Sequence, residues 1–98
     1  MTDQQRLLRD RGICVIIPTY NNAGTIVDVV QRSLLQCSDV IVVCDGCTDN
    51  TLDLLNDLQD KPTIVNLEKN SGKGAALKAG FRYALEKGFA YAITLDGD

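Results

Sequence analysis

The chain has 98 residues, of which 45% are apolar and 23% are charged, and its formal net charge is −3 at pH 7. This length predicts one domain, and the ordinary balance of apolar and charged residues argues against a disordered chain. The acidic charge and the lack of basic clusters disfavour nucleic acid as a partner. No apolar run approaches the ~20 residues of a membrane-spanning helix, and the polar start lacks the apolar core of a secretory signal, so we expect a soluble, cytoplasmic protein.

The amino-terminal part predicts a polar lead-in followed by a buried strand. Residues 1–12 are mostly polar and charged, with a short helical piece in their middle. Residues 13–17 form a continuous apolar run rich in β-branched side chains, which is typical of a strand buried on both faces of a parallel sheet. Proline lacks the N–H group that a sheet needs, so we expect Pro18 to end this strand and residues 19–22 to form a loop.

The middle of the chain predicts two helices and two further strands. Residues 24–37 carry apolar side chains at three- and four-residue spacing, which predicts an amphipathic helix. Residues 40–44 repeat the pattern of a buried strand, and residues 45–50 have the composition of a turn. A short helix over 52–58 and a shorter strand over 63–67 follow, separated by a proline that ends the helix.

The last third predicts a glycine-rich loop over 70–74, a helix over 75–87 and a strand over 91–95. The complete order, β-α-β-α-β-α-β, predicts an α/β fold with a mainly parallel sheet between helices on both faces, a Rossmann-like three-layer α/β/α arrangement. Ligands of such sheets bind beyond the carboxyl ends of the strands. We therefore expect the polar loops 18–22, 45–50 and 97–98 to meet at one binding site.

Two carboxylates follow the last apolar run directly. Asp96 and Asp98 are two residues apart, and alternate side chains of an extended strand point to the same face. Mg²⁺ and Mn²⁺ prefer oxygen ligands, and Mg²⁺ is often bound by one or two carboxylates together with substrate phosphates. The spacing predicts a metal–diphosphate site, and the alternative is a plain Asp-Gly turn.

The four cysteines, Cys14, Cys37, Cys44 and Cys47, do not match a zinc-binding pattern. Cys44 and Cys47 form one Cys-x-x-Cys motif, but neither a second motif nor any histidine accompanies it. A thioredoxin-like redox pair is also disfavoured, because no apolar helix starts at the second cysteine. We therefore expect buried, reduced thiols that pack as small apolar side chains.

Four motifs follow one another along the chain, at residues 17–22 (IPTYNN), 45–51 (DGCTDNT), 70–77 (NSGKGAAL) and 96–98 (DGD). Together they resemble the N-terminal, nucleotide-binding half of a family 2 glycosyltransferase with the GT-A fold. The third motif most resembles the polyprenyl-phosphate branch, which includes dolichyl-phosphate mannosyltransferases. The resemblance implies that residues 13–98 are the nucleotide-sugar-binding portion of a GT-A domain, truncated after its fourth strand.

The resemblance implies a base and ribose site formed by the first two motifs. Pro18 and Tyr20 match positions that pack on the base and ribose, although Tyr20 could instead simply cover the sheet. Asp45 matches a carboxylate that accepts a hydrogen bond from the base, with a plain turn residue as the alternative. Asn22 belongs to the same loop and stands at a position where many relatives carry glutamate. Cys47 stands where relatives usually have serine.

The resemblance also implies a diphosphate site. Asp96 matches the first carboxylate of the Asp-x-Asp motif, near the ribose or the metal, and Asp98 matches the metal ligand itself. Lys73 resembles a phosphate-binding lysine, and the alternative is an ordinary surface lysine. For Asp49 we expect a different task, which is to cap the helix that follows it.

The activity implied is the transfer of a sugar from a UDP- or GDP-linked nucleotide-diphospho-sugar to a polyprenyl phosphate or a glycan. The implied mechanism inverts the anomeric carbon, uses Mg²⁺ or Mn²⁺, and needs a general base. That base would follow Asp98, so no catalytic residue is expected within the 98 residues.

These expectations describe a fragment of a longer enzyme, with the parent at the inner membrane surface. We expect the fragment to bind the donor weakly, to be inactive, and to self-associate through the uncovered edge of its last strand. The main alternative is a non-catalytic sugar-nucleotide-binding or regulatory module. A nucleotidyltransferase and a flavodoxin-like receiver domain are disfavoured, because the first loop lacks the glycines of the former and the paired acidic residues of the latter.

Overall fold

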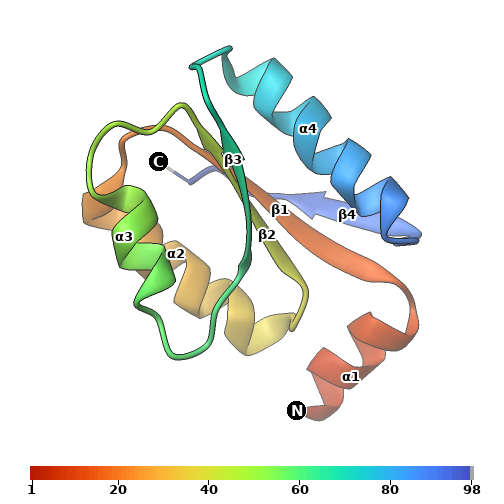
Figure 1. The fold of residues 1–98 in the computed structure, drawn as a ribbon. Coiled ribbons are helices and arrows are strands. Elements are labelled where there is room, and N and C mark those ends of the chain that lie inside the picture. The colour runs from red at the N-terminus through yellow and green to blue at the C-terminus, as the bar shows by residue number, and fades with distance from the viewer. Residues whose placement is uncertain (98) are drawn as a thin grey trace.

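A computed structural model describes residues 1–97, and within this range it shows a four-stranded sheet with helices on both faces (Figure 1). The strands are β1 (Ile13–Thr19), β2 (Val40–Asp45), β3 (Thr63–Leu67) and β4 (Tyr91–Thr94). The helices are α1 (Asp3–Asp10), α2 (Ala23–Gln36), α3 (Thr51–Asn56) and α4 (Lys73–Glu86). All strand pairs are parallel, so the predicted three-layer α/β/α architecture is confirmed.

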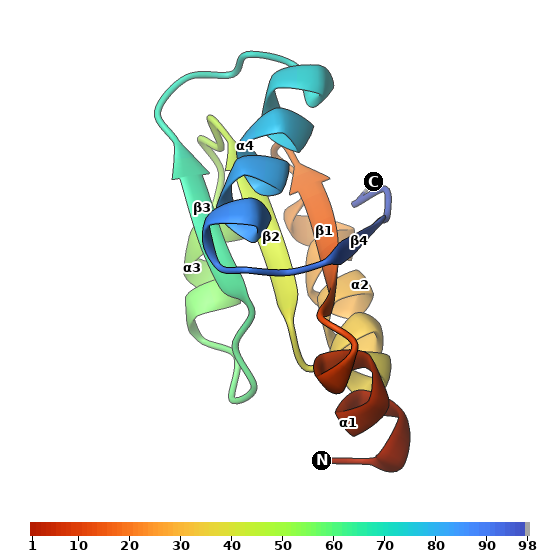
Figure 2. The ribbon, with the colours of Figure 1, turned by 90° about the vertical axis from the view of Figure 1, so that its right-hand side faces the viewer.

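The strand order is β3-β2-β1-β4. The chain steps outward from β1 to β2 to β3, and then returns across the sheet to place β4 on the other side of β1. Because crossovers between parallel strands keep one hand, this reversal moves the connecting helix to the opposite face. Helix α4 accordingly lies in front of the sheet in Figure 2, with α2 and α3 behind it.

The continuous apolar runs of β1 and β2 are buried on both faces, as their composition predicts. Alternate residues enter two separate apolar clusters, one under α2 and α3 and one under α4. The first cluster contains the strand residues Val15, Ile17, Val40, Val42 and Cys44, and the second contains Cys14, Ile16, Ile41 and Val43. The two central strands therefore form a rigid base for the loops at their carboxyl ends.

Pro18 does not end β1, contrary to the expectation from sequence. It pairs in register with Val43, and the strand continues to Thr19. Backbone groups of successive strand residues face opposite neighbours, and the missing N–H of Pro18 faces β4. There the pairing of β1 with β4 stops at Ile16 and Thr94, so the proline removes no hydrogen bond from the central ladder.

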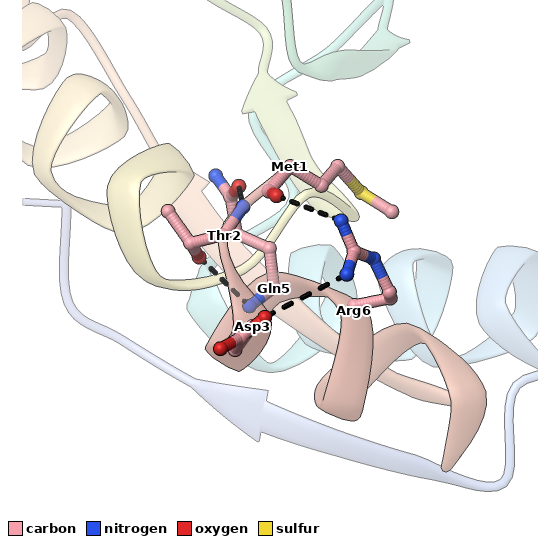
Figure 3. A network of polar contacts seen from close by, with 5 residues as sticks. All are labelled: Met1, Thr2, Asp3, Gln5 and Arg6. Carbon is pink, nitrogen blue, oxygen red and sulfur yellow. Dashed lines mark hydrogen bonds and ion pairs between the residues drawn. The ribbon is translucent and has the colours of Figure 1, made fainter.

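The polar lead-in contains a complete helix, α1, which begins with a reciprocal capping box (Figure 3). The Thr2 hydroxyl accepts the Gln5 N–H, and the Gln5 side chain accepts the Thr2 N–H. The Gln5 amide also donates to the Leu34 carbonyl at 2.6 Å, which fixes α1 to the end of α2.

No helix within residues 1–97 is long and apolar enough to cross a membrane.

Candidate functional site

Five of the six residues predicted to bind a nucleotide-sugar line one cavity of about 250 Å³ beyond the carboxyl ends of the strands. They are Pro18, Tyr20, Asp45, Lys73 and Asp96, and the other lining residues are Thr19, Asn70, Gly72 and Ala76. Two larger hollows of about 640 and 600 Å³ lie elsewhere, the first beside α1 and α2 and the second beside β3 and α4, and neither contains a predicted site residue.

The loop after β1 is fixed by two asparagines that directly follow the exposed Tyr20. Asn21 has a left-handed backbone (φ 45°), and its side-chain oxygen accepts the N–H groups of Thr48 at 2.7 Å and Asp49 at 3.1 Å. Asn22 does not line the cavity; its side-chain amide donates to the Gly97 carbonyl. These contacts tie the loop after β1 to the segments that follow β2 and β4, which holds Tyr20 at the cavity.

Asp45 is a buried carboxylate with two backbone partners. One oxygen accepts the Ser71 N–H at 2.9 Å and the other accepts the Gly72 N–H at 3.0 Å. A carboxylate accepts about four hydrogen bonds, so acceptor capacity remains for a further donor. Asp45 therefore organises the glycine-rich loop as well as lining the cavity.

Gly46 lets that loop pack directly on the end of β2. Its φ is 72°, and a Cβ at this position would lie 2.2 Å from the Asn70 nitrogen. Its own N–H donates to the Leu67 carbonyl at 3.1 Å. A larger residue would push the glycine-rich loop away from Asp45.

The glycine-rich loop leads directly into α4, which begins at Lys73 rather than at the predicted residue 75. Gly72 precedes the helix with φ 95°, a conformation that glycine adopts without strain. The Lys73 ammonium donates to the Asp96 carboxylate at 3.2 Å, and both side chains are about 60% exposed. The cavity is thus bordered by one cation and by the carboxylates of Asp45 and Asp96.

Asp49 lies beside the cavity loops rather than in the cavity, and it is not the N-cap of α3 expected from the sequence, because that position is Asn50. Its carboxylate accepts the Thr51 N–H at 3.0 Å and the Ala23 N–H at 3.4 Å. The adjacent Thr51 side chain and these N–H groups hold the pKa of Asp49 below its ordinary value. The residue thereby joins the beginnings of two helices.

The predicted metal ligands are placed only in part, because Asp98 lies outside the described residues. Asp96 presents a carboxylate at the cavity, which is the ligand type that Mg²⁺ and Mn²⁺ prefer. Within residues 1–97 no three Cys, Asp or Glu side chains come together as a metal-binding group. The donor type fits a hard divalent ion held between Asp96 and a further oxygen donor.

Several contributors to the cavity wall are not singled out by sequence reasoning. Thr19 is one, with a buried hydroxyl that has no hydrogen-bond partner in the described part of the chain. Asn70 is another, and its side chain accepts the Gly72 N–H at 3.1 Å. Only their positions in the sequence point to the site, since Thr19 lies at the end of a strand and Asn70 lies inside a glycine-rich motif.

Comparison with known proteins gives one family and several curated relatives. Residues 14–98 match the family described as Glycosyl transferase family 2. The polyprenol monophosphomannose synthase of Mycolicibacterium smegmatis is 34% identical over 90 residues, which is 86% of this chain and 34% of that protein. The undecaprenyl-phosphate 4-deoxy-4-formamido-L-arabinose transferase of Pectobacterium carotovorum is 31% identical, over 90% of this chain and 29% of its own length. The chain thus spans about a third of the length of these relatives.

Solved structures show the same fold. Residues 1–349 of Staphylococcus aureus TarS superpose with a TM-score of 0.71 at 27% identity, over 88% of this chain and 27% of that one. Glucosyl-3-phosphoglycerate synthase from Mycobacterium tuberculosis, solved with Mn²⁺, UDP and glucosyl-3-phosphoglycerate, gives 0.72 at 23% identity, over 98% of this chain and 37% of that one. The GT-A fold expected from the four motifs is therefore confirmed.

Proposed function

The chain belongs to glycosyl transferase family 2, and from this membership we propose that residues 13–98 form the nucleotide-sugar-binding part of a glycosyltransferase. The proposed donor is a UDP- or GDP-linked sugar, and the proposed acceptor is a polyprenyl phosphate. Two relatives named for polyprenyl-phosphate chemistry support this acceptor, and the UDP in the mycobacterial synthase structure supports a nucleoside diphosphate.

The observation that carries the proposal is the cavity at the carboxyl ends of β1, β2 and β4. Residues from four separate segments line it together, and its wall combines an aromatic ring, a cation and two carboxylates. Its volume of about 250 Å³ is slightly below the ~300–1,000 Å³ of typical small-molecule sites, which suits one part of a donor, such as a base with its ribose.

Each cavity residue has a proposed task. Tyr20 and Pro18 provide an apolar wall for the base, because a tyrosine ring packs on flat apolar groups while its hydroxyl stays in water. Asp45 accepts a ring N–H with the acceptor capacity that its two loop contacts leave. Lys73 contacts a phosphate oxygen, and Asn22 acts indirectly by fixing the loop after β1.

A divalent ion, Mg²⁺ or Mn²⁺, would be held by Asp96 and Asp98. When bound, it supplies positive charge that stabilises the diphosphate leaving group. The Mn²⁺ in the mycobacterial synthase structure supports this choice.

The proposed reaction is a direct displacement with inversion. An acceptor oxygen forms a bond to the anomeric carbon while the bond from that carbon to the diphosphate breaks, and a hydroxyl acceptor passes its proton to a general base. We place that base outside the 98 residues, so these residues alone transfer nothing, and we propose that they bind the donor weakly. We place the full enzyme in the cytoplasm, at the inner membrane surface.

The proposed self-association uses the free edge of β4. Tyr91 and Ile93 occupy alternate positions of β4 and are 68% and 48% exposed, and Leu95, just after the strand, is 40% exposed. Exposed apolar edge strands favour pairing with another chain. Light scattering should show a dimer that an Ile93→Lys variant lacks, and a monomer at high concentration would contradict this part of the proposal.

Calorimetric titration of the 98-residue chain with UDP and with GDP, each with Mn²⁺, tests the proposed site. We expect one nucleotide to bind, and a Tyr20→Ala variant to bind about tenfold more weakly. The matched control is Phe81→Ala, which removes an equally exposed aromatic ring that does not line the cavity and should bind normally. Absence of binding by both nucleotides would reject the proposal, and sugar transfer by the isolated chain would reject its inactivity.

A further inference from the structure

The Cys44-x-x-Cys47 motif has no task in the proposed function, yet the structure brings its two thiols together beside the cavity. The chain turns sharply between them: the Gly46 N–H donates to the Cys44 carbonyl at 3.0 Å, and Gly46 has φ 72°. The Cys47 sulfur lies 3.7 Å from the Thr19 carbonyl oxygen, and Thr19 is the strand partner of Cys44. Cys47 therefore lies against the residue of β1 whose backbone pairs with Cys44, and it packs against the apolar cluster under α2 and α3 that contains Cys44.

The two thiols differ in accessibility. Cys44 is fully buried, whereas Cys47 is half-buried. Burial raises the pKa of Cys44 to about 12, and the adjacent Cys47 thiol contributes to this shift through its charge and a hydrogen bond. Thiolates are the nucleophiles of disulfide exchange, so Cys47 is the thiol that an external reagent meets first and Cys44 is its buried neighbour.

We propose that Cys44 and Cys47 form an intramolecular disulfide when the chain meets a small-molecule disulfide such as oxidised glutathione, and that this link changes the cavity. The Cys47 thiolate attacks one sulfur of the reagent, whose S–S bond breaks and releases one glutathione thiolate. The Cys44 thiol then loses its proton and attacks the Cys47 sulfur, which displaces the second glutathione as a thiolate that takes up this proton. The protein loses two protons and two electrons, which together are two hydrogen atoms, and two molecules of reduced glutathione carry them away.

The link would act on the cavity because the residues between the cysteines hold its wall. Asp45 accepts the N–H groups of Ser71 and Gly72, and Gly46 packs on the backbone of Asn70. A disulfide requires Cα atoms within roughly 4.4–6.8 Å, so closing the ring constrains the backbone of both residues. We expect the glycine-rich loop to lose its contacts with Asp45 in the oxidised chain.

Peptide mapping by mass spectrometry after treatment of the folded chain with oxidised glutathione tests the link directly. The expected product is a Cys44–Cys47 peptide lighter by two hydrogen atoms, with no glutathione retained and with the fully buried Cys14 and Cys37 unmodified. A glutathione adduct that persists on Cys47 while Cys44 stays a thiol would overturn the proposal, as would a chain that does not react.

Two variants test which cysteines form the link. Cys44→Ser removes the second thiol, so the adduct on Cys47 should persist. Cys14→Ala is the matched control, because it removes a buried cysteine from the opposite face of β1 and should leave the link intact. Loss of the link in Cys14→Ala would assign the chemistry to another pair and overturn the proposal.

The effect on the cavity is read from hydrogen exchange at the Ser71 and Gly72 amides, which should be at least about tenfold faster in the oxidised chain and return to normal after reduction. Unchanged exchange would overturn the coupling to the cavity. A second measurement rests on the proposed function: oxidation should weaken binding of UDP or GDP with Mn²⁺ about tenfold. If the reduced chain binds neither nucleotide, the proposed function fails, while the mapped disulfide and the exchange rates still decide this inference.

Discussion

The Lys73 ammonium lies 3.2 Å from the Asp96 carboxylate, so an ion pair connects the start of α4 to the segment after β4 beside the cavity. Both side chains are about 60% exposed, and exposed ion pairs contribute less than about 1 kcal/mol to stability. The ion pair therefore places two opposite charges at the cavity but contributes little to the stability of the fold.

Lys73→Met tests this division between stability and binding. We expect the melting temperature to change by only a few degrees, because less than about 1 kcal/mol is lost. Affinity for UDP or GDP with Mn²⁺ should fall about tenfold, because charged hydrogen bonds contribute about 1.5–3 kcal/mol. Calorimetry on Lys73→Met and on the control Lys61→Met, an exposed lysine remote from the cavity, measures both effects. Equal affinity in the two variants would contradict the proposed phosphate contact.

Asp45→Asn should destabilise the chain by about 1–3 kcal/mol, because one of its two backbone N–H partners then meets an NH₂ group instead of an acceptor. In a domain of this size each kcal/mol lowers the melting temperature by about 4–8 °C, so differential scanning calorimetry resolves the loss. The control is Asp10→Asn at an exposed position of α1, which should melt like the wild type. If both variants melted alike, Asp45 would not organise the glycine-rich loop.

Gly80→Ala should destabilise the chain by about 1–3 kcal/mol, because the added Cβ would lie 2.6 Å from Ile16 Cγ2 in the fully packed layer under α4. Gly74→Ala in the first turn of the same helix meets no atom within 4 Å, so it should gain up to about 1 kcal/mol of helix propensity. Urea unfolding of the two variants compares them directly. Opposite signs are expected, and a loss in both would show that helix packing is not what separates the two glycines.

Alkaline pH should destabilise the folded chain through Cys44. Its pKa is raised by burial from 9.0 to about 12, so between these values the unfolded chain loses a proton that the folded chain keeps. Stability is therefore complete below pH 9 and falls as the pH rises toward 12, by up to about 1.4 kcal/mol per pH unit for this group. Denaturant unfolding at several pH values should give a steeper fall for the wild type than for Cys44→Ala. Parallel curves would contradict this assignment.

The central strands follow from the sequence. A strand that is buried on both faces requires an uninterrupted apolar run, and β1 and β2 each have one. The end of β1 does not follow, because a proline is compatible with a strand whenever its nitrogen faces an unpaired neighbour. Which neighbour Pro18 faces depends on where β4 stops pairing, and no local pattern gives that information.

The location of the site also follows from the sequence, since parallel strands bring their carboxyl ends to one edge of the sheet. The hydrogen-bond partners of the site residues do not follow from the sequence. Asp45 accepts backbone N–H groups, which every residue except proline offers, so nothing in the composition of residues 70–74 points to it. Asn22 is similar, because its partner is the carbonyl of a glycine far away in the chain.

The pairing of β4 with β1 has a consequence for the order in which the molecule assembles. It joins Ile13 to Tyr91 and so closes nearly the whole chain into a loop, whereas β1 with β2 and β2 with β3 close much shorter ones. Long loops lose the most chain entropy on closure and form slowly. Because Asp96 reaches the cavity only through this closure, we expect a kinetic intermediate in which β1, β2 and β3 are already paired while Asp96 has not yet reached the cavity.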